Sequence, residues 1–202
     1  MKEKLEKILI RIFDLVLSSI GLTGLSLLYI PIAIAIKIDD WDGPVLFYQK
    51  RIGLNGMVFD AIKFRTMKVG SDKFGVFKPD QDDTRVTRVG KWLRRTCLDE
   101  TPQLWNVFKG EMSMVGPRPE VYDSEVLSKY DSDLLNLRQT CKPGLTGQGQ
   151  VLGKINGGKE ISDYPIMSVD IQCVLYPNKL AQYWVSIFLT IFYIRQLMKI
   201  NR

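Results

Sequence analysis

The longest feature of the hydrophobic pattern is a run without a charged residue from Leu15 to Ile36. Its 22 positions would form a helix of about 33 Å, close to the thickness of the hydrocarbon core of a bilayer. Such a run either meets lipid or is a wholly buried helix. Basic residues precede it, namely Lys2, Lys4, Lys7 and Arg11. Aspartates follow Lys37, so the charge asymmetry keeps the amino terminus in the cytoplasm.

Pro31 lies inside this run. Proline removes one backbone donor and clashes with the preceding turn, so we expect the helix to kink or break there. Two topologies remain open from these residues: a simple span that exports the rest of the chain, and a re-entrant hairpin that leaves both ends in the cytoplasm. A cleaved signal peptide is disfavoured, because the run is longer than an ordinary signal core and lacks a small-x-small site before Lys37.

Beyond the run, residues 45–64 contain two short stretches rich in β-branched and aromatic residues, VLFYQ and MVFDAIKF. Glycines and an asparagine separate them, which predicts a β-hairpin. Residues 69–84 contain glycines, a proline and many aspartates with weak periodicity. That composition is typical of an exposed loop.

Two helices are predicted between residues 84 and 109, where apolar residues recur at helical spacing with an interruption near residues 98–102. Pro102 suits the first turn of the second helix, with Asp99 or Thr101 as its cap. This arrangement would place Asp99 and Glu100 beside a positive helix terminus, which also favours phosphate.

The carboxyl-terminal half predicts two more helices. One covers residues 120–137 and precedes a glycine-rich stretch, 143–158, whose glycines indicate tight turns or close approach to a ligand. The other contains the 15 uncharged residues 180–194, a run that is short for a span and favours an interfacial helix. The whole pattern predicts an α+β fold, mostly helical, with a small β-hairpin.

Composition narrows the chemistry. The chain of 202 residues has a formal charge of +6 and a pI near 9.2, which indicates nucleic acid, a phosphorylated substrate or anionic lipid as a partner. It contains no histidine, which excludes an imidazole base and a histidine-ligated metal. Three cysteines without a CxxC pair argue against zinc and against a disulfide framework. Carboxylates, lysines and a hard cation such as Mg²⁺ remain.

The densest charged feature leads into the acidic pair Asp99 and Glu100. The basic residues before the pair are Arg85, Arg88, Lys91, Arg94 and Arg95. A solvated helix face with ordinary ion pairs, or a simple helix cap, would give a similar pattern. The arginines favour catalysis instead, because phosphoryl transfer needs charge neutralisation and positioning more than an acid or base of special strength.

Pro117-Arg118-Pro119 is a second candidate feature. A rigid turn with an exposed arginine is its ordinary interpretation. A guanidinium on a stiff turn also suits bidentate phosphate binding. The glycine-rich stretch matches neither GxxxxGKS nor GxGxxG, so no Walker or Rossmann site follows from it.

Three segments carry a specific resemblance: KFRTM at 63–67, LRRTCLDETPQLWNVFKGEMSMVGPRPE at 93–120 and KPGLTGQGQV at 142–151. Together with RIFDLVLSSIG at 11–21 and the proline-interrupted run, they closely resemble the bacterial sugar transferases called monotopic phosphoglycosyl transferases. The resemblance covers nearly the whole chain in the right order. The length matches the minimal catalytic form of that family.

The resemblance implies a re-entrant membrane anchor over residues 1–40 and a catalytic domain over 41–202, with 178–200 as an interfacial helix. The protein would then lie at the cytoplasmic face of the bacterial inner membrane. The implied partners are a UDP-sugar donor, a polyprenyl (undecaprenyl) phosphate acceptor and membrane lipid, with no nucleic acid. Homo-oligomerisation is left open.

The resemblance also implies a magnesium-dependent reaction in two steps, at the first membrane step of glycoconjugate or polysaccharide synthesis. Asp99 would attack the sugar-bearing phosphate, release UMP and hold a phosphosugar, which the polyprenyl phosphate then accepts. Asp99 and Glu100 would hold Mg²⁺. The implied substrate-binding residues are Lys63, Arg65, Arg94, Pro117, Arg118, Pro119, Thr146 and Gln150.

The chain departs from the family pattern at Ile30, where serine commonly precedes the proline. It also has Gln148, Lys154 and Gln182 where tryptophan, arginine and aspartate are common. Two rival functions remain: a nucleic-acid binder, which would explain the net charge but not the uncharged run, and an inactive membrane-anchored scaffold of the same fold, against which the intact acidic pair argues.

Overall fold

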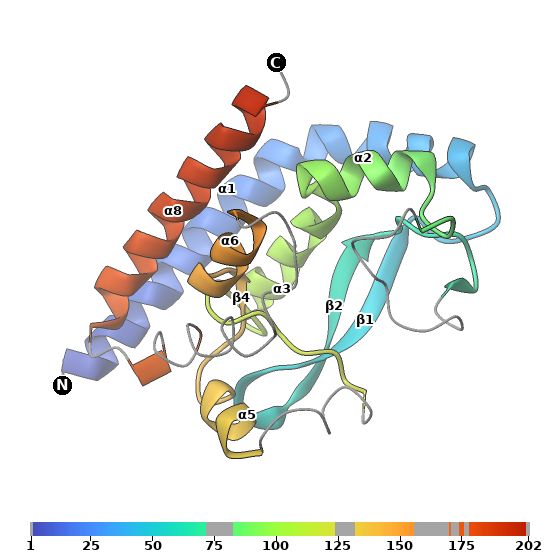
Figure 1. The fold of residues 1–202 in the computed structure, drawn as a ribbon. Coiled ribbons are helices and arrows are strands. Elements are labelled where there is room, and N and C mark those ends of the chain that lie inside the picture. The colour runs from blue at the N-terminus through green and yellow to red at the C-terminus, as the bar shows by residue number, and fades with distance from the viewer. Residues whose placement is uncertain are drawn as a thin grey trace.

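The computed structural model describes residues 2–71, 83–123, 132–155, 170, 174–175 and 178–200. Figure 1 shows α1 and α8 lying together on one side of the molecule and the β1–β2 hairpin on the other, with α3 between them. The predicted α+β class, mostly helical with a small hairpin, is confirmed. The elements are α1 (Lys2–Asp39), β1 (Leu46–Ile52), η1 (Leu54–Gly56), β2 (Val58–Phe64), α2 (Arg88–Thr96), η3 (Leu98–Gln103), α3 (Leu104–Lys109), β3 (Ser113–Val115), α5 (Ser132–Arg138), β4 (Gly144–Thr146), α6 (Gln148–Ile155) and α8 (Lys179–Ile200).

Helix α1 is a single helix of 38 residues that contains Pro31. It therefore does not break at the proline, although Figure 1 shows its axis turning between the part along α8 and the part along α2. One missing backbone bond is tolerated here because Ile32 and Ile36, in the next turn, are buried in the core. The helix is long and apolar enough to cross a membrane. Much of its apolar surface faces outward, with Leu27 81% and Ile38 80% exposed.

The hairpin predicted at residues 45–64 is confirmed. β1 and β2 pair antiparallel, with Leu46 opposite Phe64 and Ile52 opposite Val58. At the turn, Asn55 has φ 55° and Gly56 has φ 77°, conformations that asparagine and glycine adopt at low cost. Most of the loop predicted at 69–84 lies outside the described residues.

The core joins the end of α1 to the hairpin and α2. Ile32 and Ile36 pack with Phe64 of β2 and Leu93 of α2 in one buried cluster. Helix α2 can lie this close to the chain after β2 because its third residue is a glycine: a Cβ on Gly90 would meet the Thr66 carbonyl oxygen at 2.1 Å. This close approach places the start of α2 beside the segment that follows β2.

The helix predicted over residues 120–137 is wrong at its start. Residues 120–123 are extended beside β1, where the Ile52 amide donates to the Glu120 carbonyl and the Tyr122 amide donates to the Lys50 carbonyl, both at 3.0 Å. Helix α5 covers Ser132–Arg138, and residues 124–131 lie outside the described residues. The free edge of β1 provides backbone partners that helical periodicity cannot reveal.

The described part of the glycine-rich stretch forms β4 and α6, and its close approach is to the protein's own backbone; residues 156–158 lie outside the described residues. β4 pairs parallel with β3. A Cβ on Gly144 would lie 2.0 Å from the Gly116 amide nitrogen, and a Cβ on Gly147 would lie 2.3 Å from the Gly116 carbonyl oxygen. These glycines therefore allow two backbone segments to touch directly beside the Pro-Arg-Pro turn.

Asp14 ties α1 to the rest of the fold. Its Oδ1 accepts hydrogen bonds from Ser113 Oγ at 2.9 Å, from the Met114 amide at 2.8 Å and from the Tyr183 hydroxyl at 3.0 Å. The carboxylate is buried. α8 confirms a helix over the predicted residues 180–194, and Tyr183 fixes it against α1.

We expect Asp14→Ala to lower the free energy of unfolding by about 3 kcal/mol, because buried donors on Ser113 and Tyr183 lose a charged acceptor. Denaturant unfolding of the purified protein in detergent measures this. Glu3→Ala, at an exposed position of the same helix, is the control and should change stability by less than about 0.5 kcal/mol. Equal unfolding midpoints for the two variants would show that the Asp14 contacts contribute nothing.

Candidate active site

The acidic pair lies on η3, the 3₁₀ turn between α2 and α3. α2 ends at Thr96 and is capped by Cys97, whose φ of 58° and ψ of 17° lie in the left-handed region. The chain therefore changes direction directly before Asp99 and Glu100. This confirms the corner predicted at residues 98–102.

The predicted helix cap is wrong. Pro102 lies inside η3, and α3 begins two residues later at Leu104, with no side-chain hydrogen bond at either N-cap. Thr101 uses its hydroxyl to donate to the Leu98 carbonyl at 2.7 Å. The side chains of Asp99 and Glu100 therefore do not cap η3 or α3.

Glu100 is held between two cations. Its Oε1 accepts from Lys63 Nζ at 2.9 Å and from Arg118 Nη2 at 2.7 Å. The side chains of Glu100 and Lys63 are each 15% exposed, whereas that of Arg118 is 40% exposed. Burial raises the pKa of Glu100, but the charges of Arg118 and Lys63 outweigh it and hold the pKa well below the ordinary value. Glu100 is thus a fixed anion.

Asp99 has a different environment. Among the described residues no hydrogen bond or ion pair to its carboxylate is found. Burial and the adjacent Glu100 charge raise the pKa of Asp99, and Lys63, Arg94 and Arg118 oppose them. The pair therefore consists of one engaged carboxylate and one that is available to react, inside a basic shell.

Lys63 reaches Glu100 from β2. Burial lowers the pKa of Lys63 to about 8, against the opposing charge of Glu100. An ammonium group with such a pKa exchanges its proton near neutral pH, so its charge is sensitive to its surroundings. An incoming phosphate would favour the charged form.

Arg94 and Arg65 occupy different places. Arg94 Nε donates to Thr66 Oγ1 at 2.8 Å. Burial lowers the pKa of its guanidinium, and the neighbouring Asp99 charge opposes that shift, so Arg94 belongs to the shell around the acidic pair. Arg65 instead pairs with Asp40 and donates to the Pro44 carbonyl at 2.6 Å. It closes the loop between α1 and β1.

The Pro117-Arg118-Pro119 turn is anchored at both prolines. The Pro117 carbonyl accepts from the Gly144 amide at 2.9 Å. The Pro119 carbonyl accepts from Arg51 Nη1 at 2.7 Å in a buried contact. With both ends fixed, the Arg118 side chain is presented to Glu100 from a stiff backbone.

Thr146 and Gln150 make contacts away from the acidic pair. Thr146 Oγ1 is 2.7 Å from Thr190 Oγ1 on α8. Gln150 Nε2 donates to the Gly144 carbonyl at 3.3 Å. In these contacts both residues hold β4 and α6, beside the segment that carries Arg118.

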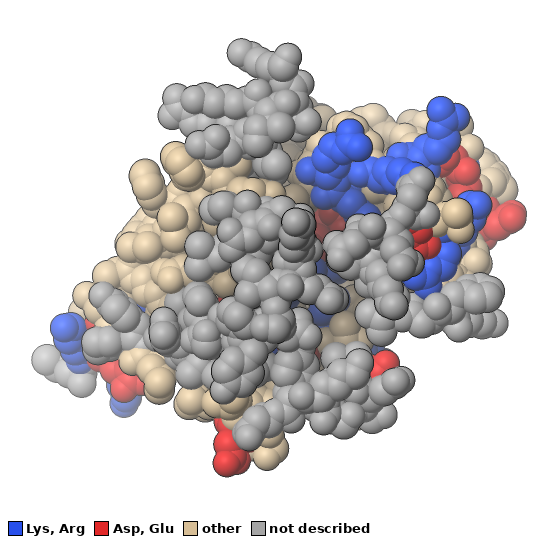
Figure 2. All heavy atoms as spheres, in the orientation of Figure 1, with Lys and Arg blue, Asp and Glu red and all other residues tan. Residues whose placement is uncertain are grey.

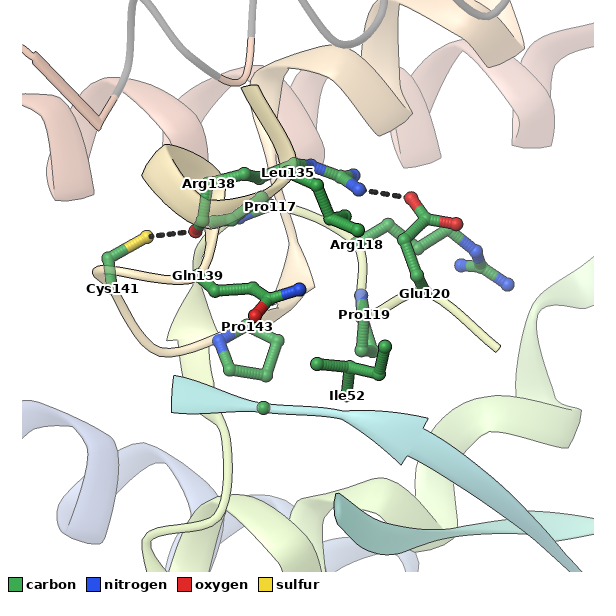
Figure 3. Close-up of a pocket in the computed structure, with 11 residues that line it drawn as sticks. Ile52, Pro117, Arg118, Pro119, Glu120, Leu135, Arg138, Gln139, Cys141 and Pro143 are labelled. Carbon is green, nitrogen blue, oxygen red and sulfur yellow. Dashed lines mark hydrogen bonds and ion pairs between the residues drawn. The ribbon is translucent and has the colours of Figure 1, made fainter. Parts of the chain in front are cut away.

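Two arginines of this region were missed by the sequence reasoning, Arg51 and Arg138. Arg51 follows the alternation of a strand and resembles an ordinary polar position, and Arg138 ends a short helix; neither carries a motif signal. Figure 3 shows a cavity whose lining includes Arg118, Arg138, Pro117, Pro119 and Pro143, with Arg138 reaching Glu120. Only the contacts in the folded chain show what Arg51 and Arg138 do.

The surface near the site is basic. Figure 2 shows Lys and Arg side chains gathered over α2, whereas most of the surface drawn in tan lies over the middle of α1 and the described part of α8. The exposed cations of α2 are Arg88, Lys91 and Arg95. Such a patch attracts anionic ligands toward the acidic pair.

Asp99 and Glu100 are the hard oxygen donors of the site. Within the described ranges, no group of three or more aspartate, glutamate, cysteine or histidine side chains is arranged to hold a metal ion. Mg²⁺ is usually bound through one or two carboxylates together with substrate phosphates. The pair fits Mg²⁺ in that shared mode, and not as a metal centre made by protein alone.

Comparison with known proteins gives a consistent result. The family model described as "Bacterial sugar transferase" matches residues 5–194. The chain is 42% identical to the undecaprenyl-phosphate glucose phosphotransferase of Komagataeibacter xylinus, over 71% of this chain and 27% of that protein. It is 42% identical to the UDP-glucose:undecaprenyl-phosphate glucose-1-phosphate transferase of Escherichia coli, over 73% and 32%, and 36% identical to the galactosyl transferase CpsE of Streptococcus agalactiae, over 81% and 37%. The chain thus matches about a third of the length of these relatives.

Proposed function

We propose that this chain, which belongs to the bacterial sugar transferase family, moves a sugar 1-phosphate from a UDP-sugar to a polyprenyl phosphate and releases UMP. The relatives named for glucose and galactose transfer support a hexose donor. The observation that carries the proposal is the pairing of an unengaged Asp99 with a Glu100 held between Lys63 and Arg118.

The proposed reaction gives different roles to the two carboxylates, which have different environments. An Asp99 oxygen attacks the phosphorus that bears the sugar and forms a P–O bond. The bond from that phosphorus to the bridging oxygen breaks, and its electron pair leaves with UMP. An oxygen of the polyprenyl phosphate then attacks the same phosphorus, and the Asp99 carboxylate leaves. The product is a polyprenyl diphosphate that carries the sugar.

The cations around the pair supply the charge neutralisation that this chemistry requires. Arg118 and Lys63 already bind a carboxylate oxygen, and the same donors suit the oxygens of the diphosphate. Arg94 lies close enough to influence Asp99. Mg²⁺, held by Asp99 and Glu100 together with the substrate, would neutralise the charge of the diphosphate and of the leaving UMP.

A re-entrant anchor at the cytoplasmic face is also part of the proposal. Both ends of α1 pack on the same domain: Arg11 donates to the Val107 and Phe108 carbonyls, and Asp39 accepts from the Val89 amide. A helix that crossed the bilayer completely would separate these ends. The exposed apolar residues of α8, among them Phe188 and Ile191, support an interfacial position for that helix.

Accessibility tests this topology. In a variant without native cysteines, single cysteines at Lys4 and Asp42 should both react with a membrane-impermeant maleimide in inside-out vesicles, and neither should react in intact spheroplasts. Reaction of one site from each side would establish a full span.

UMP release tests the function. Purified protein in nanodiscs is incubated with Mg²⁺, undecaprenyl phosphate and a panel of UDP-sugars that includes glucose, galactose and N-acetylated hexosamines. We expect one donor class to release UMP in a manner that depends on the acceptor and on Mg²⁺. If folded protein releases no UMP with any donor of the panel, the result would favour the inactive scaffold.

We expect kcat/KM for the donor to fall above pH about 8, because kcat/KM reports groups of the free enzyme and Lys63 loses its proton there. It should also fall in acid as Asp99, whose pKa burial raises, is protonated and ceases to be a nucleophile. Lys63→Arg should remove the alkaline limb, because a guanidinium keeps its charge.

The matched control is Lys50→Arg, at an exposed lysine on the neighbouring strand, and its pH profile should equal that of the wild type. If kcat/KM of Lys63→Arg still falls at alkaline pH, the fall must be assigned to the titration of another group.

A further inference from the structure

The turn that carries Arg118 is followed by a buried charge network that none of the reaction steps uses. Arg138, at the end of α5, pairs with Glu120 and with Asp170. Its Nη2 lies 2.6 Å from Asp170 Oδ2, and the side chains of Arg138 and Asp170 are 6% and 2% exposed. Figure 3 shows Arg138 directed at the Glu120 carboxylate beside the two prolines. Burying charges is costly, so such a network is weak evidence for a gain in stability.

Glu120 links this network to Arg118. Pro119, with its fixed φ, is the one residue between them, so the orientation of Glu120 constrains the backbone of Arg118. The Glu120 carbonyl is itself fixed by the Ile52 amide at 3.0 Å. The Glu120 charge also acts on Arg118: Glu100, then Asp99 and Glu120, raise the pKa of its guanidinium. A Glu120 without a partner would therefore compete with Glu100 for Arg118.

We propose that Arg138 is a positioning residue for Arg118: by pairing with Glu120 it fixes the turn and keeps Glu120 from drawing the Arg118 guanidinium away from the acidic pair. Asp170 completes the arrangement by orienting Arg138 through Nε and Nη2. This inference rests on the proposed function, because it assigns Arg118 to substrate phosphate. Arg138 itself touches none of the reacting groups.

A double-mutant cycle separates positioning from general stability. Arg138→Met should lower kcat/KM for the donor about 10- to 100-fold, the scale of a misplaced binding group. In an Arg118→Ala background the same substitution should change kcat/KM by less than about twofold, because its effect passes through Arg118. Adding Glu120→Gln to Arg138→Met should restore part of the lost activity by removing the competing charge. Lys50→Met, at an exposed lysine of β1, is the control and should have no effect.

Hydrogen exchange provides a readout without turnover and with a milder variant. Arg138→Lys keeps one charge but cannot bridge two carboxylates in the same geometry. Exchange should accelerate in peptides containing Ile52 and Gly144, whose amides donate to the Glu120 and Pro117 carbonyls on either side of Arg118. It should also accelerate at Tyr122, whose amide donates from the same segment to the Lys50 carbonyl of β1, and should remain unchanged in α3.

The outcomes are distinct. Equal losses of kcat/KM in the Arg118 and Arg118→Ala backgrounds, or exchange that accelerates uniformly across the chain, would overturn the positioning role and reduce Arg138 to a structural residue. A wild type that turns over no donor would overturn the proposed function, and the local exchange pattern would still decide whether Arg138 holds the turn.

Discussion

Asp99→Asn is expected to reduce UMP release by at least about 1,000-fold, as loss of a catalytic nucleophile does. The amide keeps the shape of the side chain but cannot form the acyl phosphate. Among the described contacts the Asp99 carboxylate has no partner to lose, so the fold should be unaffected. UMP release is measured with the donor found in the panel, and unfolding is measured in parallel.

The covalent step gives a second readout for this variant. Wild-type protein incubated with donor and without acceptor should gain the mass of the phosphosugar on the peptide containing Asp99, and Asp99→Asn should not. Asp60→Asn, at a partly exposed aspartate of β2, is the matched control and should keep full activity. A phosphosugar found on Glu100 instead would reverse the assignment of the pair.

Arg118→Ala is expected to lower kcat/KM for the donor about 100-fold, the typical effect of removing one preorganised donor from a developing anion. The side chain is presented by a turn fixed at Pro117 and Pro119 and already binds an oxyanion of Glu100. Arg118→Lys should recover part of the activity, because an ammonium retains the charge but not the bidentate geometry.

Lys50→Ala is the control for this effect, since Lys50 is an exposed cation of β1 that lies outside the basic patch of α2. It should change kcat/KM by less than about twofold, as exposed charges away from the substrate contribute little. Similar losses in the two variants would mean that Arg118 acts through net charge and not through a specific contact.

The parts of the site that sequence could predict are those whose geometry is local. The basic residues that precede Asp99 and Glu100, and the corner between the two helices, lie within one short segment of the sequence. The structure confirms the corner. The contact of Lys63 with Glu100 joins residues 37 positions apart. A shared motif can indicate such a contact, but periodicity cannot.

The remaining differences have physical reasons. Lys63 and Arg65 alternate like two residues on one face of a strand, but β2 ends at Phe64. Arg65 is therefore free to turn toward Asp40. At residue 120 the backbone pairs with the open edge of β1 and does not form the helix that the sequence pattern predicts. Arg138 and Asp170 form an ion pair although they lie 32 positions apart in the sequence. A local sequence pattern cannot predict such a buried pair.

Helix α1 is part of the folded core and is not a detachable tether. Ile32 and Ile36 supply half of the four residues that form the main core cluster, and Asp14 supplies the acceptor for three separate donors. A truncation that begins after residue 40 would strip the core and should yield aggregated chain, not a water-soluble catalyst. By the same connection, a bilayer whose thickness strained the helix in its proposed position would transmit that strain through Phe64 of β2 to the neighbouring Lys63.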